Sequence, residues 1–143
     1  MSLNILIVDD SATMRRMITR TLHLSGLPVD GVFEAANGRE GLLALAKNRI
    51  DLALIDINMP EMNGEEMIAR IRQNPTFKDL AVVVVSTEGS TTRIASLMKE
   101  AAVGFVHKPF TPERLSQVVY EVTGGTHGNA TEEPSEPVSG PDF

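Results

Sequence analysis

Reactive polar side chains stand at the ends of four of the five short apolar runs in this chain. They are Asp9 and Asp10 just after the first run, Asp56 at the end of the third, Ser86 and Thr87 at the end of the fourth, and Lys108 just after the fifth. Any one of them has an ordinary explanation, because acids and hydroxyls are common at helix starts and lysines at surfaces. Their joint placement at the same point of a repeating pattern instead predicts one shared site.

The three carboxylates predict a metal ion. Carboxylates brought together repel one another, and burial raises their pKa values unless a cation shares the site. Mg²⁺ suits such a site because it prefers oxygen ligands, binds only one or two carboxylates directly and leaves room for phosphate oxygens; Mn²⁺ is the expected substitute. Because Lys108 and the Ser86 hydroxyl can contact other phosphoryl oxygens, the predicted chemistry is phosphoryl transfer to Asp56.

The five apolar runs are short and mostly β-branched or aliphatic, which is typical of strands buried on both faces. They cover residues 3–8, 31–35, 51–56, 80–86 and 103–107. Each is followed by a segment with apolar residues at helical spacing, and Asn37, Asn63 and Thr111 stand where three of these helices should be capped. The sequence therefore repeats a strand and a helix five times.

This repeat predicts an α/β fold: a five-stranded parallel sheet with helices on both faces, in a doubly wound (βα)5 open sandwich of the flavodoxin-like kind. A closed barrel of eight such units would need about 250 residues, so the length of this chain, 143 residues, excludes it. Ligands bind open sheets of this type outside the carboxyl ends of the strands. The polar residues named above all lie at those ends.

Composition narrows the class of protein. The chain is 42% hydrophobic and 22% charged, which suits one domain, here residues 1–123. The lack of cysteine excludes disulfides and thiolate metal sites. No apolar stretch approaches the roughly 20 residues that span a bilayer, so we expect a cytoplasmic protein without membrane insertion. The net charge of −6 argues against nucleic-acid binding.

Residues 124–143 differ from the rest of the chain. They are acidic, rich in Gly and Pro, and contain no Lys or Arg. Such a composition buries too little apolar surface to offset the entropy lost on ordering. We expect a flexible tail or linker there.

Four motifs together resemble the receiver domain of two-component response regulators. They are "VDD" (8–10), "DINMPEMNG" (56–64), "VSTE" (85–88) and "GFVHKPF" (104–110). The stretch "DDSATMRR" (9–16) is most similar to the single-domain chemotaxis (CheY-like) type. The likeness covers residues 3–123 and all five strand–helix units, which makes it far more specific than one short pattern.

The resemblance implies a role for each site residue. Asp56 would be phosphorylated by a phosphohistidine of a sensor histidine kinase, and Asp9, Asp10, Asp56 and the backbone carbonyl of Asn58 would bind Mg²⁺. Ser86 and Lys108 would bind the phosphoryl group, Phe105 would be the aromatic switch residue, and the bond from Lys108 to Pro109 would be cis. Asn58 and Glu88, two positions after Asp56 and Ser86, resemble the pair that modulates dephosphorylation.

Two residues depart from the commonest pattern of the family. Phe105 stands where Tyr is frequent, so packing without a hydroxyl would carry the signal. Thr87 stands where Ala or Gly is frequent, and its bulk would narrow access to Asp56.

The resemblance also implies partners: a sensor histidine kinase, a downstream target protein such as the flagellar motor switch, and a phosphatase. We expect a stand-alone, monomeric receiver that is no enzyme beyond its own phosphorylation and slow dephosphorylation. A phosphorelay intermediate and a phosphorylation-independent binding module remain as alternatives. A phosphatase of the haloacid dehalogenase type would carry an Asp-x-Asp pattern, whereas Asp9 and Asp10 are adjacent in this chain. An electron carrier of the flavodoxin type would need a phosphate-binding loop rich in Ser, Thr and Gly after the first strand, and the sequence has no such loop there.

Overall fold

The computed structural model describes residues 2–87 and 91–124, in which strands and helices alternate as the sequence predicts. Their bounds are β1 Leu3–Val8, α1 Ala12–Leu24, β2 Val29–Ala35, α2 Gly38–Lys47, β3 Leu52–Ile55, α3 Gly64–Gln73, β4 Ala81–Ser86, α4 Thr91–Ala101, β5 Gly104–His107 and α5 Pro112–Val122.

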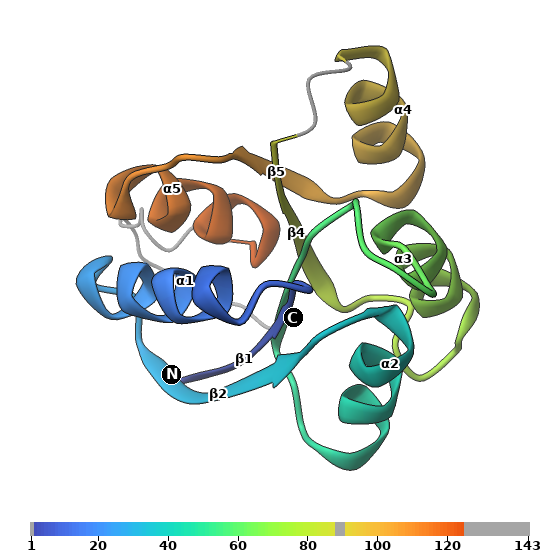
Figure 1. The fold of residues 1–143 in the computed structure, drawn as a ribbon, viewed down its shortest axis with the longest axis horizontal. Helices are drawn as coiled ribbons and strands as arrows, with labels where there is room; N and C mark the ends of the chain where they lie inside the picture. Colours follow the sequence, from blue (N-terminus) through green and yellow to red (C-terminus); the bar gives the residue numbers. More distant parts are fainter. Residues whose placement is uncertain (1, 88–90, 125–143) are drawn as a thin grey trace, which may run out of the picture.

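The strands form one parallel sheet in the order β2-β1-β3-β4-β5. Helices α1 and α5 cover one face, and α2, α3 and α4 cover the other (Figure 1). This is the predicted doubly wound (βα)5 sandwich. Because the order reverses between β1 and β3, the carboxyl ends of these two strands flank the point where ligands bind such sheets.

Alternate residues of the central strands supply two separate cores. Ile5 and Ile7 of β1 face α1 and α5, whereas Leu6 and Val8 face α2 and α3. All four residues of β3 are buried, as expected for a central strand covered on both sides. This double burial fixes the register of the strands and hence the positions of the residues that follow them.

Three of the helices begin at the capping residues that the sequence predicts. The side chains of Asn37, Asn63 and Thr111 each accept a hydrogen bond from the backbone N–H three residues later. In α3 the Glu66 side chain also accepts from the Asn63 N–H, which completes a capping box. These caps set where the helices after β2, β3 and β5 start.

The second strand starts two residues before its predicted position. The pairing of β1 with β2 contains an irregularity between Leu3 and Ile5, where the Asn4 side-chain oxygen accepts a hydrogen bond from the Gly31 N–H at 3.1 Å. This side-chain contact lets the strand continue through Asp30 and Gly31, a pair of residues that otherwise indicates a turn.

None of the helices in the described part of the chain is both long enough and apolar enough to cross a lipid bilayer.

Candidate functional site

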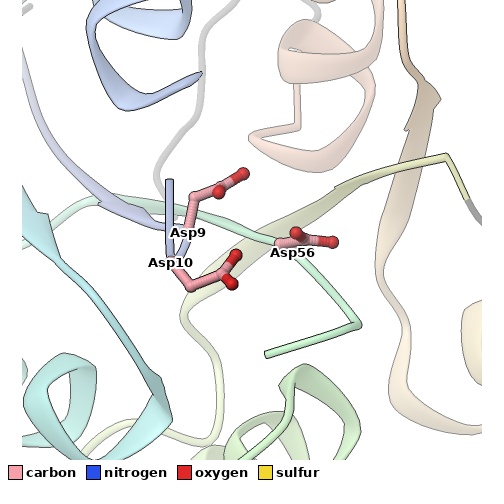
Figure 2. A group of neighbouring side chains, drawn as sticks. All are labelled: Asp9, Asp10 and Asp56. Carbon is pink, nitrogen blue, oxygen red and sulfur yellow. The ribbon is translucent and has the colours of Figure 1, made fainter. Parts of the chain in front are cut away.

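The strand register brings the predicted site residues together. Val8 of β1 is paired with Ile55 of β3, which is in turn paired with Val84 of β4. The acids that follow β1 and β3 therefore emerge side by side, and Figure 2 shows Asp9, Asp10 and Asp56 as one group. Each offers a carboxylate oxygen, and these oxygens all lie within 4.8 Å of one another.

Asp9 is the most constrained of the three acids. It is 2% exposed, and its Oδ1 accepts a hydrogen bond from the Ser11 N–H at 2.9 Å. Its Oδ2 lies 2.9 Å from Lys108 Nζ, which comes from the segment after β5. Asp10, by contrast, is exposed. The pair therefore combines a fixed buried carboxylate with one that faces solvent.

Asp56, which follows β3 directly, is also buried, with 8% exposure. Its Oδ1 accepts a hydrogen bond from the Asn58 N–H at 3.3 Å, and its Oδ2 lies 3.5 Å from Lys108 Nζ. Burial raises the pKa of Asp56 above its ordinary value and outweighs the lowering by Lys108. The charge of Asp9 raises this pKa further, and hydrogen bonds from Asn58 and Ser86 oppose it. Burial therefore disfavours the ionised form of Asp56.

The backbone holds Ser86 and Lys108 in adjacent positions. Ser86, the last residue of β4, is fully buried, and its carbonyl accepts a hydrogen bond from the Lys108 N–H at 2.9 Å. The peptide bond between Lys108 and Pro109 is cis, as predicted. Both side chains therefore reach Asp56 from the β4 and β5 side of the site.

The start of α3 is pressed against the backbone of Asp56. The Gly64 N–H donates to the Ile57 carbonyl at 2.8 Å, and a Cβ on Gly64 would overlap the Asp56 carbonyl oxygen. Only glycine allows this approach. The "MNG" part of the motif thus fixes the turn that presents Asp56.

Phe105 lies on β5, at one side of the sheet, partly buried against the core beneath α4. Its ring packs edge to face with the exposed His107, with 6.2 Å between the ring centroids. Phe105 is therefore both a core residue and part of the β5 surface.

A groove of about 290 Å³ adjoins the site. It is lined by Met14, Met17, Ile18, Thr21, Thr87, Lys108, Pro109 and Phe110. Thr87 is exposed and lines the same groove as Lys108. Met17 belongs to the apolar stripe of α1 by spacing, yet it is 56% exposed at this groove.

The site also contains Arg15, which the sequence did not indicate. Its guanidinium donates to the Asp9 carbonyl oxygen at 2.6 Å and to Glu34 Oε1 at 2.7 Å. A basic residue six positions after an acid is the only sequence signal, and it is a weak one.

The predicted dephosphorylation-modulating pair and the predicted tail both extend beyond the residues that the structure describes. Glu88 lies outside the described residues, as do residues 125–143 of the predicted tail. Asn58 is described and is exposed beside Asp56.

The donor set fits the predicted Mg²⁺. The cluster consists of hard carboxylate oxygens, and one of the carboxylates is exposed to solvent. Burial raises the pKa of Asp56, and a divalent cation beside it would favour the charged form that burial disfavours. A parallel (βα)5 sheet with acids after β1 and β3 and a lysine after β5 defines a receiver-type signalling domain.

Comparison with known proteins agrees with this class. Residues 5–120 match the response regulator receiver domain family. A "Chemotaxis protein CheY homolog" of Campylobacter jejuni is 36% identical over 92% of this chain and 100% of its own length. "Chemotaxis protein CheY1" of Helicobacter pylori is 37% identical over 85% of this chain and 98% of its own.

The solved structure of Vibrio cholerae chemotaxis protein CheY4 superposes with a TM-score of 0.73 at 34% identity, over 85% of this chain and 99% of that one. The chain belongs to the response regulator receiver family, and the relatives named here are of its CheY type.

Proposed function

We propose that this receiver accepts a phosphoryl group on Asp56 from a phosphohistidine of a sensor histidine kinase. The observation that carries the proposal is a buried Asp56 carboxylate 3.5 Å from the Lys108 ammonium and next to two further acids. In the transfer, an Asp56 oxygen bonds to phosphorus, the donor's phosphorus–nitrogen bond breaks, and the departing imidazole nitrogen keeps the electron pair. The protein's part is to position the acceptor and to stabilise the phosphoryl charge.

Mg²⁺ would be held by Asp9, Asp10, Asp56 and the backbone carbonyl of Asn58, and when bound it supplies positive charge at the phosphoryl oxygens. Lys108 moves from Asp9 to a phosphoryl oxygen, a short shift because it already lies within 3.5 Å of both acids. The Ser86 hydroxyl donates to another phosphoryl oxygen. These donors act in a largely dry site, where each is worth more than in water.

The signal leaves the site through Phe105. Movement of Ser86 towards the phosphoryl group opens space that the Phe105 ring fills, which changes the surface formed by α4, β5 and α5. A phosphoryl group that makes different contacts in the two packings shifts the population between them. The names of the chemotaxis relatives support a target protein in motility, such as the flagellar motor switch.

Asn58 and Glu88 would set the lifetime of the phosphorylated state by positioning an attacking water or admitting a phosphatase side chain. The chain would turn over no other substrate. The output is a protein contact made by a monomer.

The test is the intact mass after incubation with acetyl phosphate, with and without Mg²⁺. We expect one added phosphoryl group that requires Mg²⁺ and is lost in Asp56→Asn. Asp30→Asn, which changes an exposed acid near the start of β2, should be labelled as wild type is. Labelling of Asp56→Asn to full stoichiometry would refute the assignment. An unlabelled wild type that also fails to bind beryllofluoride would leave a phosphorylation-independent binding module.

A further inference from the structure

Arg15 joins three elements around the acidic cluster. It projects from the first turn of α1, and its Nη1 donates to the backbone carbonyl of Asp9 at 2.6 Å. Its Nε donates to Oε1 of Glu34, next to the last residue of β2, at 2.7 Å. The Arg15 side chain is 16% exposed and the Glu34 side chain 45%, so the contact of Arg15 with the Asp9 carbonyl is the more buried of the two.

The carbonyl that Arg15 binds belongs to the peptide group between Asp9 and Asp10. The Asp9 carboxylate has its own anchors in Ser11 and Lys108. The Asp10 carboxylate differs: it is exposed, and within residues 2–87 and 91–124 it has no hydrogen bond or ion pair. The direction in which Asp10 points therefore depends on its backbone, which is held by the hydrogen bond from the Asp9 N–H to the Ala35 carbonyl and by Arg15 at the Asp9 carbonyl.

We propose that Arg15 is a positioning residue for the metal site, which orients the Asp9–Asp10 peptide so that the Asp10 carboxylate faces a divalent cation. The inference rests on the Mg²⁺ site of the proposed function. Groups that orient metal ligands from outside the ligand shell change metal affinity when they are removed.

The role is one of geometry rather than of charge. The positive charge of Arg15 is paired with Glu34, so its net effect on a cation is small. The rigid guanidinium fork, however, bonds Glu34 and the Asp9 carbonyl at once. A lysine at this position would keep the charge but has a single ammonium on a flexible stem.

The experiment measures Mn²⁺ binding directly, from the electron paramagnetic resonance signal of free Mn²⁺, in wild type, Arg15→Ala, Arg15→Lys and Arg16→Ala. Arg16 is the matched control because it is the next residue of α1 and is exposed. We expect Arg15→Ala to weaken Mn²⁺ binding about 10-fold, the lower end of the range for such groups. Arg15→Lys should recover only part of this loss, and Arg16→Ala should bind as wild type does.

A second readout separates positioning from general damage. With acetyl phosphate, Arg15→Ala should need more Mg²⁺ for half-maximal labelling of Asp56 and yet reach the wild-type rate when Mg²⁺ saturates. Unchanged Mn²⁺ affinity in Arg15→Ala, full recovery in Arg15→Lys, or a rate that stays low at saturating Mg²⁺ would each overturn the inference. If Arg15→Ala does not fold, the Mn²⁺ affinity of Arg15→Lys is compared with that of wild type, and equal affinities would overturn the inference.

The two proposals fail in different ways. A wild-type chain that binds Mn²⁺ but is never phosphorylated would refute the proposed function and leave the role of Arg15 to be judged from the affinities. A wild-type chain that binds no Mn²⁺ would refute both.

Discussion

Lys108 lies closer to Asp9 than to Asp56, the proposed phosphoryl acceptor. Its Nζ is 2.9 Å from Asp9 Oδ2 and 3.5 Å from Asp56 Oδ2, and the Lys108 and Asp9 side chains are 11% and 2% exposed. The lysine is thus the cation that keeps two buried carboxylates together when no metal is present.

Removal of the Lys108 charge should destabilise the metal-free protein. In Lys108→Met the buried acids lose their common partner, and loss of one member of a buried ion pair costs about 3 kcal/mol. Urea denaturation in EDTA should show this loss of unfolding free energy, and Mg²⁺ should recover more stability in Lys108→Met than in wild type. Lys99→Met, at an exposed position of α4, is the control. An equal loss in both variants would contradict the ion-pair argument.

The raised pKa of Asp56 predicts a pH-dependent gain from Asp56→Asn. Because the folded-state pKa lies above the unfolded value, the folded chain binds more protons between the two, so stability falls as pH rises through that window. In EDTA at pH 7, Asp56→Asn should therefore have a higher urea midpoint than wild type. The difference should shrink as the pH is lowered to about 4, near the ordinary carboxyl pKa. A difference that does not vary with pH would exclude ionisation of Asp56 as its cause.

Gly64 should tolerate no side chain. In Gly64→Ala the new Cβ would overlap the Asp56 carbonyl oxygen and lie 2.8 Å from Ile57 Cα, and neither backbone atom can rotate away. We expect a loss of about 1–3 kcal/mol, as for other overpacked sites, together with slower labelling of Asp56 because its turn must shift. Urea denaturation and acetyl-phosphate labelling measure the two effects.

The control for this prediction is Gly26→Ala. Gly26 has a φ of +83° but nothing within 4 Å of a Cβ, so alanine there costs stability through backbone strain alone. In Gly26→Ala, Asp56 should be labelled by acetyl phosphate at the wild-type rate. Slow labelling in Gly26→Ala as well would show that lost stability, and not the contact with Asp56, limits the reaction.

The central part of the site followed from the sequence because parallel strands impose it. Once the apolar runs are recognised as strands of one parallel sheet, Asp9 and Asp56 must lie at the same edge of that sheet. The observed strand order, in which β1 and β3 are neighbours, then places them side by side. Capping residues were equally predictable, because a cap acts over three residues: the hydrogen bond from the Glu66 N–H to Asn63 needs no tertiary contact.

Arg15 could not be predicted in the same way. Its two acceptors lie 6 and 19 residues away, on different elements, and only the packing of α1 against β2 makes both reachable. The exposure of Met17 has a similar origin. The spacing of apolar residues places Met17 on the apolar stripe of α1, but the packing of the segment after β5 decides how much of this stripe is covered. Helical and strand periodicity therefore could not predict contacts between elements that are distant in sequence.

Thr87 provides the last test, which concerns access to Asp56. It is exposed, follows Ser86 directly and lines a groove together with Lys108, so we expect its side chain to limit the approach of a small phosphodonor to Asp56. Thr87→Ala should be labelled faster by acetyl phosphate than wild type, because the methyl and hydroxyl groups that narrow this path are removed. Thr87→Val keeps the volume without the hydroxyl and should be labelled at the wild-type rate. If Val and Ala accelerate labelling equally, the hydroxyl and not the bulk is responsible, and equal rates in all three proteins would show that Thr87 does not control access.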